Sequence, residues 1–384
     1  MAESYLVEPD VGFIKDLAKL GGQDLKKCFQ CATCSVACPI SPDNKPFPRK
    51  EMIATSWGLK DKVLGSADIW LCHNCGDCTT LCPRGAKPGD VLAALRAYAV
   101  TQYAAIKPLA KAVQDPKQLP ILMAIPVAIF LILGFILNLA VPSISWLNFA
   151  PVGDHLWQSD YINNYLVDII MIPTLAFAVI SFGLGLKNFV ADIHANALAS
   201  GKTDKKTIDP AGFVRSLIRT VPTIIKHAKF NECGENKDRS TSHMMVLFSF
   251  VGLFIVTNCF FIAEWVLHIE GPYSQWSPVK WLGNVSGVAL IVGGALMVKK
   301  RMDNSDSVTS YWDWSLLGLV LTLGLTGMLT EMFRLGGLFG ISAIIYAFHL
   351  IAVWSLFAYT PYSKLAHLVY RTTAMVYQEY IEKD

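Results

Sequence analysis

Eight of the ten cysteines fall into two runs with the same internal spacing. The first run is Cys28-x2-Cys31-x2-Cys34-x3-Cys38-Pro39, and the second is Cys72-x2-Cys75-x2-Cys78-x3-Cys82-Pro83. Ferredoxins hold [4Fe-4S] clusters through thiolates with this spacing, and a proline follows the fourth cysteine in that pattern. Structural zinc and disulfides are the alternative uses of cysteine. Two complete runs with identical spacing favour two [4Fe-4S] clusters.

The spacing also predicts which thiols share a cluster, because the fourth cysteine of such a run ligates the other cluster. We predict that cluster 1 is held by Cys28, Cys31, Cys34 and Cys82. We predict that cluster 2 is held by Cys72, Cys75, Cys78 and Cys38. The surrounding apolar core is small, so we expect the domain to unfold when the clusters are lost. Thiols that ligate iron need a reducing compartment, which predicts a cytoplasmic domain.

The composition of the 384 residues is too apolar for an ordinary soluble protein, with 53% hydrophobic and only 16% charged residues. The apolar residues are unevenly distributed, so we expect a soluble domain over 1–118 and a membrane domain over 119–384. We expect no cleavable signal here, because Met1–Tyr5 lacks a basic region followed by an apolar stretch. The sequence has no long basic tract of the kind that would indicate nucleic acid as a partner.

The second domain contains six segments long enough to cross a hydrocarbon core of ~30 Å. They are 119–141, 165–190, 243–268, 281–298, 313–334 and 339–360. The fourth is rich in glycine, which permits close helix contact. Lys and Arg are concentrated in 191–242, in 299–301 and in the tail, whereas 141–164 contains none. This distribution predicts a multi-pass membrane protein with both termini and the cluster domain in the cytoplasm.

One loop segment, 211–229, has the pattern of an amphipathic helix. Phe213, Leu217 and Ile218 follow one side, and Arg215 and Arg219 lie elsewhere on its circumference. Such a helix can lie on the lipid of the inner leaflet or bind a partner protein. The pattern leaves both interpretations open.

Histidines in the membrane domain are candidate axial ligands of haem iron. His349 and His367 are 18 residues apart, about five turns of a continuous helix, which would place them on one face ~27 Å apart. His243 begins the third span and His268 ends it. The third and sixth spans run antiparallel, so we predict His243 with His367 at a cytoplasmic-side haem and His349 with His268 at an outer-side haem.

The outer ligand pair is the less regular of the two. The 25 residues between His243 and His268 would cover ~37 Å of straight helix, more than the other pair. His155 is therefore an alternative outer ligand. His194 and His227 lie in a polar loop, and we expect both to face solvent.

Acidic residues near the predicted outer face are candidates for proton transfer, because acids in a membrane are costly unless paired or functional. Glu264 in the third span is the candidate acceptor of a quinol proton. Asp168 lies early in the second span. Glu331 and Arg334 are one turn apart, which also suits a local ion pair. The fold class is thus mainly α, with a helical two-[4Fe-4S] ferredoxin-like domain before a six-helix transmembrane cytochrome b domain.

The paired cysteine runs, followed by a membrane domain that carries histidines, resemble a fusion of two heterodisulfide reductase components, its small iron-sulfur protein and its membrane cytochrome b. The membrane component of quinone-interacting membrane-bound oxidoreductase (Qmo) complexes of sulfate reducers has this arrangement. The segments 27–34 and 70–78 carry the resemblance beyond ferredoxin spacing. The membrane part also resembles the five-span nitrate reductase gamma family, with 119–141 as an added span. In that family the ligands on the last helix match His349 and His367.

The resemblance implies electron exchange between menaquinone, haem b and two cytoplasmic flavin/iron-sulfur subunits, with adenylylsulfate (APS) reductase downstream. The chain itself has no Rossmann-like glycine fingerprint, so we expect flavin and other substrate chemistry in the partners. An equivalent subunit of a heterodisulfide reductase-type complex and a redox-sensing membrane anchor are the alternatives. The surface around His73, Asn74 and Lys45–Lys50 is a candidate docking site for a partner subunit. The alternative is that it is an ordinary surface in contact with solvent.

Overall fold

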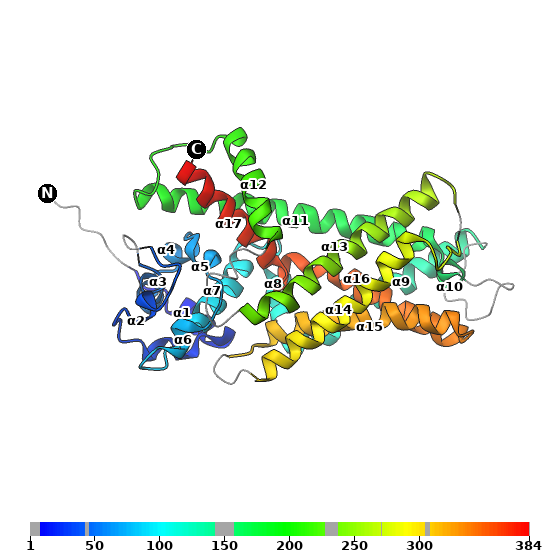
Figure 1. Cartoon of the computed structure of the whole chain (residues 1–384), viewed down its shortest axis with the longest axis horizontal. Helices are drawn as coiled ribbons and strands as arrows, with labels where there is room; N and C mark the ends of the chain where they lie inside the picture. Colours follow the sequence, from blue (N-terminus) through cyan, green and yellow to red (C-terminus); the bar gives the residue numbers. More distant parts are fainter. Residues whose placement is uncertain are drawn as a thin grey trace.

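The computed structural model describes residues 8–42, 46–142, 157–226, 237–269, 271–303 and 308–383. Within these ranges the chain is mainly helical and contains no strand. Figure 1 shows an elongated molecule with short helices at one end and long, roughly parallel helices along the rest. The predicted mainly α fold class, with an iron-sulfur domain before six apolar helices, is confirmed.

The domain with the cysteine runs consists of short helices connected by loops. They are α1 (Val11–Leu17), α2 (Thr33–Val36), α3 (Arg49–Ser56), α4 (Lys60–Leu64), α5 (Asp68–Leu71), α6 (Asp77–Thr80), α7 (Pro88–Tyr103) and α8 (Lys107–Gln114). Most of α7 is buried, and α1, α3, α4, α5 and α6 pack around it. Pro88 starts α7, where its missing N–H costs no hydrogen bond.

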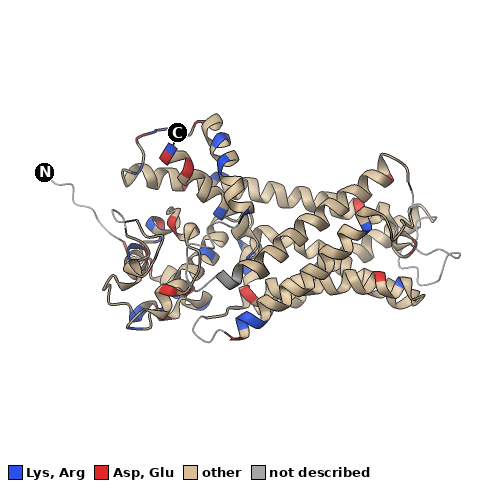
Figure 2. Ribbon diagram, viewed as in Figure 1, with Lys and Arg blue, Asp and Glu red and all other residues tan. Residues whose placement is uncertain are grey.

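Six helices in the described residues are long and apolar enough to cross a membrane. They are α9 (Leu119–Ala140), α11 (Asn164–Ala199), α13 (Lys237–Trp265), α14 (Pro278–Asp303), α15 (Tyr311–Leu335) and α16 (Phe339–Tyr359). Each overlaps one predicted span, although α11 continues past the predicted end at 190 and α13 ends before the predicted end at 268. Charged side chains gather at the two ends of the bundle and are sparse along its middle (Figure 2).

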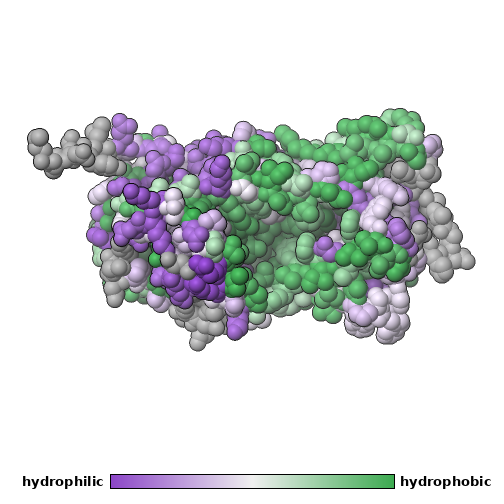
Figure 3. Space-filling view, turned by 90° about the horizontal axis from the view of Figure 1, so that it is seen from above, coloured by the Kyte–Doolittle hydropathy of each residue, from purple (hydrophilic) through white to green (hydrophobic). Residues whose placement is uncertain are grey.

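The six helices form two packed groups. Helices α9, α11 and α16 share one core, around Leu166, Leu350 and Trp354. Helices α13, α14, α15 and α16 share another, around Leu290 and Val320. Glycines bring α14 close to its neighbours, because a Cβ at Gly293 would be 3.0 Å from Met245 Cβ. The apolar surface of the spanning part has a hollow near its middle (Figure 3).

The sixth span does not continue as one helix into the C-terminal segment. Helix α16 ends at Tyr359, a 3₁₀ turn covers Thr360–Tyr362, and α17 (Ala366–Lys383) begins after a bend. Pro361 within this turn has no N–H for a helical hydrogen bond. The expectation that His349 and His367 share one face of a continuous helix is therefore wrong. Helix α17 extends beyond the end of the bundle and packs against the cysteine-bearing domain (Figure 1).

The core of this domain is completed by residues far along the chain. Trp70 on α5 stacks on Tyr370 of α17, with ring centroids 5.1 Å apart and planes 21° apart. Phe189 of α11 contacts both rings edge-on. At the surface, Asp68 forms ion pairs with Lys50 and, at 3.2 Å, with Lys202. The buried core around the cysteine runs thus includes residues of α11 and α17, which follow the boundary expected at residue 118.

Helix α12 (Pro210–Ile225) corresponds to the amphipathic segment predicted at 211–229, of which 227–229 lie outside the described residues. It packs on α17 through the side that carries small residues, at Gly212, Ser216 and Thr220. Its apolar side is exposed, and Ile218 is 67% accessible. The short helix α10 (Gln158–Tyr161) precedes α11.

Candidate functional site

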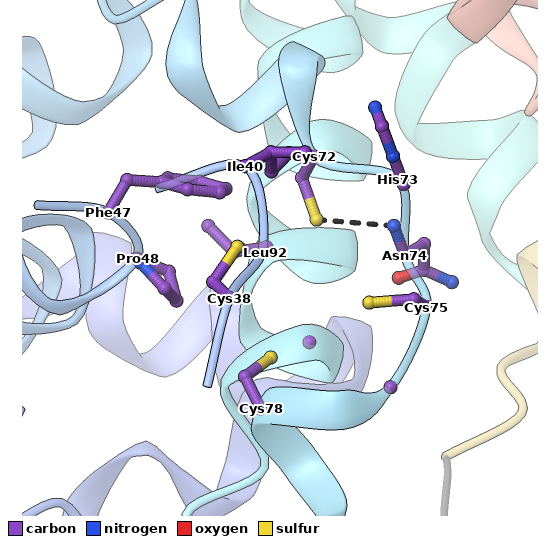
Figure 4. A pocket seen from close by; sticks show the side chains of 12 residues that line it. Cys38, Ile40, Phe47, Pro48, Cys72, His73, Asn74, Cys75, Cys78 and Leu92 are labelled. Carbon is purple, nitrogen blue, oxygen red and sulfur yellow. Dashed lines mark hydrogen bonds between the residues drawn. The ribbon is translucent and has the colours of Figure 1, made fainter. Parts of the chain in front are cut away.

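The eight cysteines of the two runs are divided between two pockets of four. The first pocket is lined by Cys38, Cys72, Cys75 and Cys78. Figure 4 shows Cys38 arriving on a separate loop from the other three, with the four side chains around a common space. This is the set of ligands predicted for cluster 2.

The second pocket is lined by Cys28, Cys31, Cys34 and Cys82. This is the predicted ligand set of cluster 1. Arg84 from the other run covers this site, with its guanidinium carbon 4.1 Å from the centre of the Phe29 ring. The exchange of the fourth cysteine ties the two loops together, so neither pocket is formed by one run alone.

The two loops repeat the same backbone conformation. Gln30 and Asn74, each two residues after the first cysteine of its run, have positive φ angles of 58° and 54°. Their backbone N–H groups donate to the sulfur of that cysteine, Gln30 to Cys28 Sγ at 3.4 Å and Asn74 to Cys72 Sγ at 3.3 Å. N–H donors to the sulfurs are one of the features that set the reduction potential of iron-sulfur clusters.

The donor geometry suits clusters better than single metal ions. In the part of the chain that the structure describes, no three His, Cys, Asp or Glu side chains converge on one ion site. The thiols instead surround two spaces, as ligands of a multi-iron cluster must. Burial raises the pKa of the Cys34 and Cys38 thiols to about 11, so iron must displace protons when it binds them.

Comparison with known proteins agrees with this geometry. A family model described as the 4Fe-4S dicluster domain matches residues 24–86. Residues 24–86 form a 4Fe-4S dicluster domain. The chain is also 31% identical over 131 residues to citrate utilization protein B of Escherichia coli, a match that covers 33% of each protein. The chain therefore matches only about a third of that relative's length. No solved structure matches at a significant level.

In the helix bundle, His349 lies on α16 at the side that faces α15. Its Nδ1 is 2.9 Å from the hydroxyl of Thr326, which itself donates to the carbonyl of Thr322 at 2.6 Å. Because the threonine proton is used in that bond, the hydroxyl accepts from Nδ1–H. The Nε2 lone pair of His349 is then available to a metal. A Cβ at Gly327 would be 3.1 Å from Cε1 of the ring, so this glycine provides its space.

His367 lies near the start of α17, at the dicluster end of the bundle. Its Nδ1 is 2.5 Å from the carbonyl oxygen of Lys364, which can only accept, so Nδ1 carries the proton. Burial lowers the pKa of His367 to about 3, which keeps the ring neutral. His243 on α13 interacts electrostatically with it, so the structure brings these two predicted ligands into one neighbourhood.

The remaining histidines occupy different environments. His268 lies beyond the end of α13, is exposed and has a positive φ of 54°. His155 and His227 lie outside the described residues. His194 contradicts the expectation of a solvent-facing side chain, because it is only 9% exposed and its Nδ1 is 2.9 Å from the Tyr377 hydroxyl. The helix α11 extends past its apolar stretch, and α17 covers it, which the local sequence does not indicate.

At the far end of the bundle, the two predicted acids are connected to neighbouring helices. Asn164 donates to Glu264 Oε1 at 2.5 Å, and Trp265 Nε1 donates to Asp168 Oδ2 at 2.7 Å. These bonds join the start of α11 to the end of α13. Tyr346 of α16 interacts electrostatically with both acids. Glu264 and Asp168 therefore belong to one polar region at this end of the bundle.

Glu331 forms the local ion pair with Arg334 that the spacing suggests, and it has further partners on other segments. It pairs with Arg334 and Lys280, each at 2.9 Å, and accepts from Gln275 and Gln158. One lysine, one arginine and two amides together saturate the carboxylate. We interpret this group as structural, since it holds the ends of α14 and α15 together.

Sequence reasoning missed the polar side chains that support the sites. Thr326 orients His349, and Arg96 donates to the Ile69 carbonyl and to Asn74 Oδ1 beside the second cysteine run. Arg371 donates to the Cys72 carbonyl. Nothing in the local pattern of these residues distinguishes them from ordinary helix residues.

Proposed function

We propose that this chain is the membrane electron-transfer subunit of a quinone-linked oxidoreductase complex. In this proposal electrons pass between menaquinol, haem b in the helix bundle and the two [4Fe-4S] clusters, and then to two cytoplasmic flavin/iron-sulfur subunits. The expected recipient further along is APS reductase in dissimilatory sulfate reduction. The proposal places the dicluster domain on the cytoplasmic side of the bacterial inner membrane.

The observation that carries the proposal is the hydrogen bonding of the His349 and His367 rings, which sets the tautomer of each. Each ring donates from Nδ1 to an oxygen, which leaves Nε2 as the ligand atom. A haem-ligating histidine needs this arrangement, because the second-shell bond fixes both the tautomer and the ring plane. Haem bound there would supply a one-electron carrier inside the apolar bundle.

The polar region at the far end suits the proton side of quinol oxidation. A quinol that loses two electrons also releases two protons, and these need acceptors that lead to water. Glu264 is our candidate acceptor, held by Asn164, and Asp168 lies in the same polar region, held by Trp265. Acids retained in a membrane bundle are commonly part of such proton paths.

The first test is the optical spectrum of the purified full-length protein in detergent. The dithionite-reduced protein should show b-type haem bands. His349→Ala and His367→Ala should each remove part of this absorbance, while His73→Ala, in the dicluster domain, should leave it unchanged. Wild-type protein with full iron-sulfur content and no b-type haem would contradict the cytochrome proposal and favour the redox-sensing anchor. His268→Ala decides whether this exposed histidine is a ligand.

The second test concerns the quinone. A menaquinol analogue should reduce the haem rapidly in the wild-type protein and at least several-fold more slowly in Glu264→Gln. Asp303→Asn, which changes an exposed acid at the other end of the bundle, is the control. Equal rates in both variants would exclude Glu264 as the acceptor. Purification from the native membrane would identify the partner subunits and separate a Qmo-type from a heterodisulfide reductase-type complex.

A further inference from the structure

One side chain of α17 is adjacent to both kinds of candidate redox centre. Arg371 Nη1 donates to the backbone carbonyl of Cys72 at 2.6 Å, although the two residues are 299 positions apart. Cys72 is one of the four thiols around the second cluster pocket. Arg371 therefore places a permanent cation against a cluster ligand.

The same side chain acts on the candidate haem ligand. Arg371 follows His367 by four residues on α17, a spacing that puts both on one side of a helix. The positive charge of Arg371 acts electrostatically on the His367 ring. The guanidinium thus binds the Cys72 loop of the dicluster domain and acts electrostatically on His367 of the same helix.

Buried aromatic packing keeps this connection in place. Trp70, two residues before Cys72, and Tyr370, beside Arg371, are 0% and 1% exposed and stack on one another. A buried stacked pair resists sliding of α17 along the cluster loop, because interiors are close-packed. The distance between the Cys72 loop and His367 is therefore set by α17, which belongs to the membrane domain in sequence.

We propose that Arg371 is a positioning residue that couples cluster 2 electrically to the redox centre at His367. This inference rests on the proposed function, since it requires haem at His367. A reduced cluster carries one more negative charge than an oxidised one, and so does a reduced haem. A fixed cation that acts on both stabilises the reduced form of each and raises both reduction potentials. Because Arg371 stabilises the reduced form of both centres from one position, its side chain need not move when an electron passes between them.

Arg96 provides a matched comparison. It also donates to the same loop, with Nη1 to the Ile69 carbonyl at 2.9 Å and Nη2 to Asn74 Oδ1 at 3.1 Å. Arg96 belongs to α7 inside the dicluster domain, however, and not to the helix that carries His367. Loss of Arg96 should affect the cluster alone, whereas loss of Arg371 should affect both centres.

The test uses redox titrations of the full-length holoprotein in detergent, with clusters followed by EPR and haem by absorbance. Arg371→Gln should lower the midpoint potentials of cluster 2 and of the His367 haem. Arg371→Lys keeps the charge and should restore most of both shifts. Arg96→Gln should lower the cluster potential and leave the haem unchanged. Iron, sulfide and haem contents equal to wild type show that each variant is folded.

Three results would overturn the inference, and they are distinguishable from failure of the proposed function. Unchanged potentials in Arg371→Gln would show that the cation does not act on the centres. A haem shift of equal size in Arg96→Gln would show a general loosening of the domain. Wild-type protein without b-type haem would overturn both the haem proposal and the coupling, whereas haem with unmoved potentials overturns the coupling alone.

Discussion

Glu51 is a buried acid in the dicluster domain whose removal should change the pH dependence of stability. Its side chain is 3% exposed on α3, and Oε2 has no hydrogen-bond partner among the described residues. Lys50 Nζ is 3.6 Å from Oε1, but this lysine also pairs with Asp68. Burial raises the pKa of Glu51 to about 7, the Asp68 charge adds to the rise, and Lys50 opposes it. The change to make is Glu51→Gln, which keeps the shape and removes the titration.

The magnitude follows from the difference between the folded and unfolded pKa values. The unfolded value is 4.5 and the folded value about 7. Because the folded state binds the proton more tightly, the contribution to stability is fully present below pH 4.5. It is lost as the pH rises to about 7. At about 1.4 kcal/mol per pKa unit, the wild type should lose roughly 3 kcal/mol across this window.

The assay is thermal loss of cluster absorbance from the full-length protein in detergent, measured between pH 5 and pH 8. The temperature at which half of the wild-type cluster absorbance is lost should fall as the pH rises towards 7. The expected fall is roughly 2–4 °C for each kcal/mol of unfolding free energy that is lost. The Glu51→Gln protein should show a flatter profile and a higher midpoint than wild type at pH 8. Asp61→Asn, an exposed acid of the same domain, is the control and should keep the wild-type slope.

Two outcomes would refute this reasoning. If Glu51→Gln keeps the wild-type slope, another group is responsible for the pH dependence. If Glu51→Gln is less stable than wild type at pH 8, the carboxylate is ionised and stabilised in the folded protein. Its pairing with Lys50 would then outweigh burial.

The remaining predictions concern the helix bundle. Glu331→Gln leaves the largely buried Lys280 and Arg334 without their carboxylate, so it should destabilise the bundle by about 3–5 kcal/mol. A thermal midpoint equal to wild type would contradict this, and Glu379→Gln on α17 is the control. Thr326→Val removes the acceptor for Nδ1 of His349. If His349 binds haem as proposed, this change should weaken haem retention by about 10–100-fold without loss of cluster iron. Haem content after incubation with excess apomyoglobin measures this, and Thr322→Val is the control.

The clusters and spans were predictable because each depends on local sequence. The x2 spacing places three thiols on one short loop, and the backbone of Gln30 and Asn74 then directs its own N–H to the first sulfur. A span needs only enough consecutive apolar residues to cross the membrane, which hydropathy reports directly. All six predicted spans accordingly overlap long apolar helices.

Predictions that assumed a continuous helix or a local environment were less successful. Spacing put His349 and His367 on one helix face, but the chain turns at Pro361 and redirects α17. A polar loop suggested that His194 is solvated, yet Tyr377 covers it. In both cases the deciding contact comes from a helix that is distant or reoriented, and hydrophobic periodicity carries no information on which helix that is.

Much of this protein's chemistry could be predicted from local sequence: the two sets of four thiols, the apolar spans and the histidines that are candidate metal ligands. These follow from residue type and short spacing, which fix what a segment can ligate or bury. The way in which these parts are connected depends instead on tertiary packing. Trp70 stacks on Tyr370 and Arg371 binds the Cys72 loop because α17 packs against the dicluster domain. That packing depends on the shapes of surfaces that lie 299 positions apart in the chain, and no local pattern specifies it.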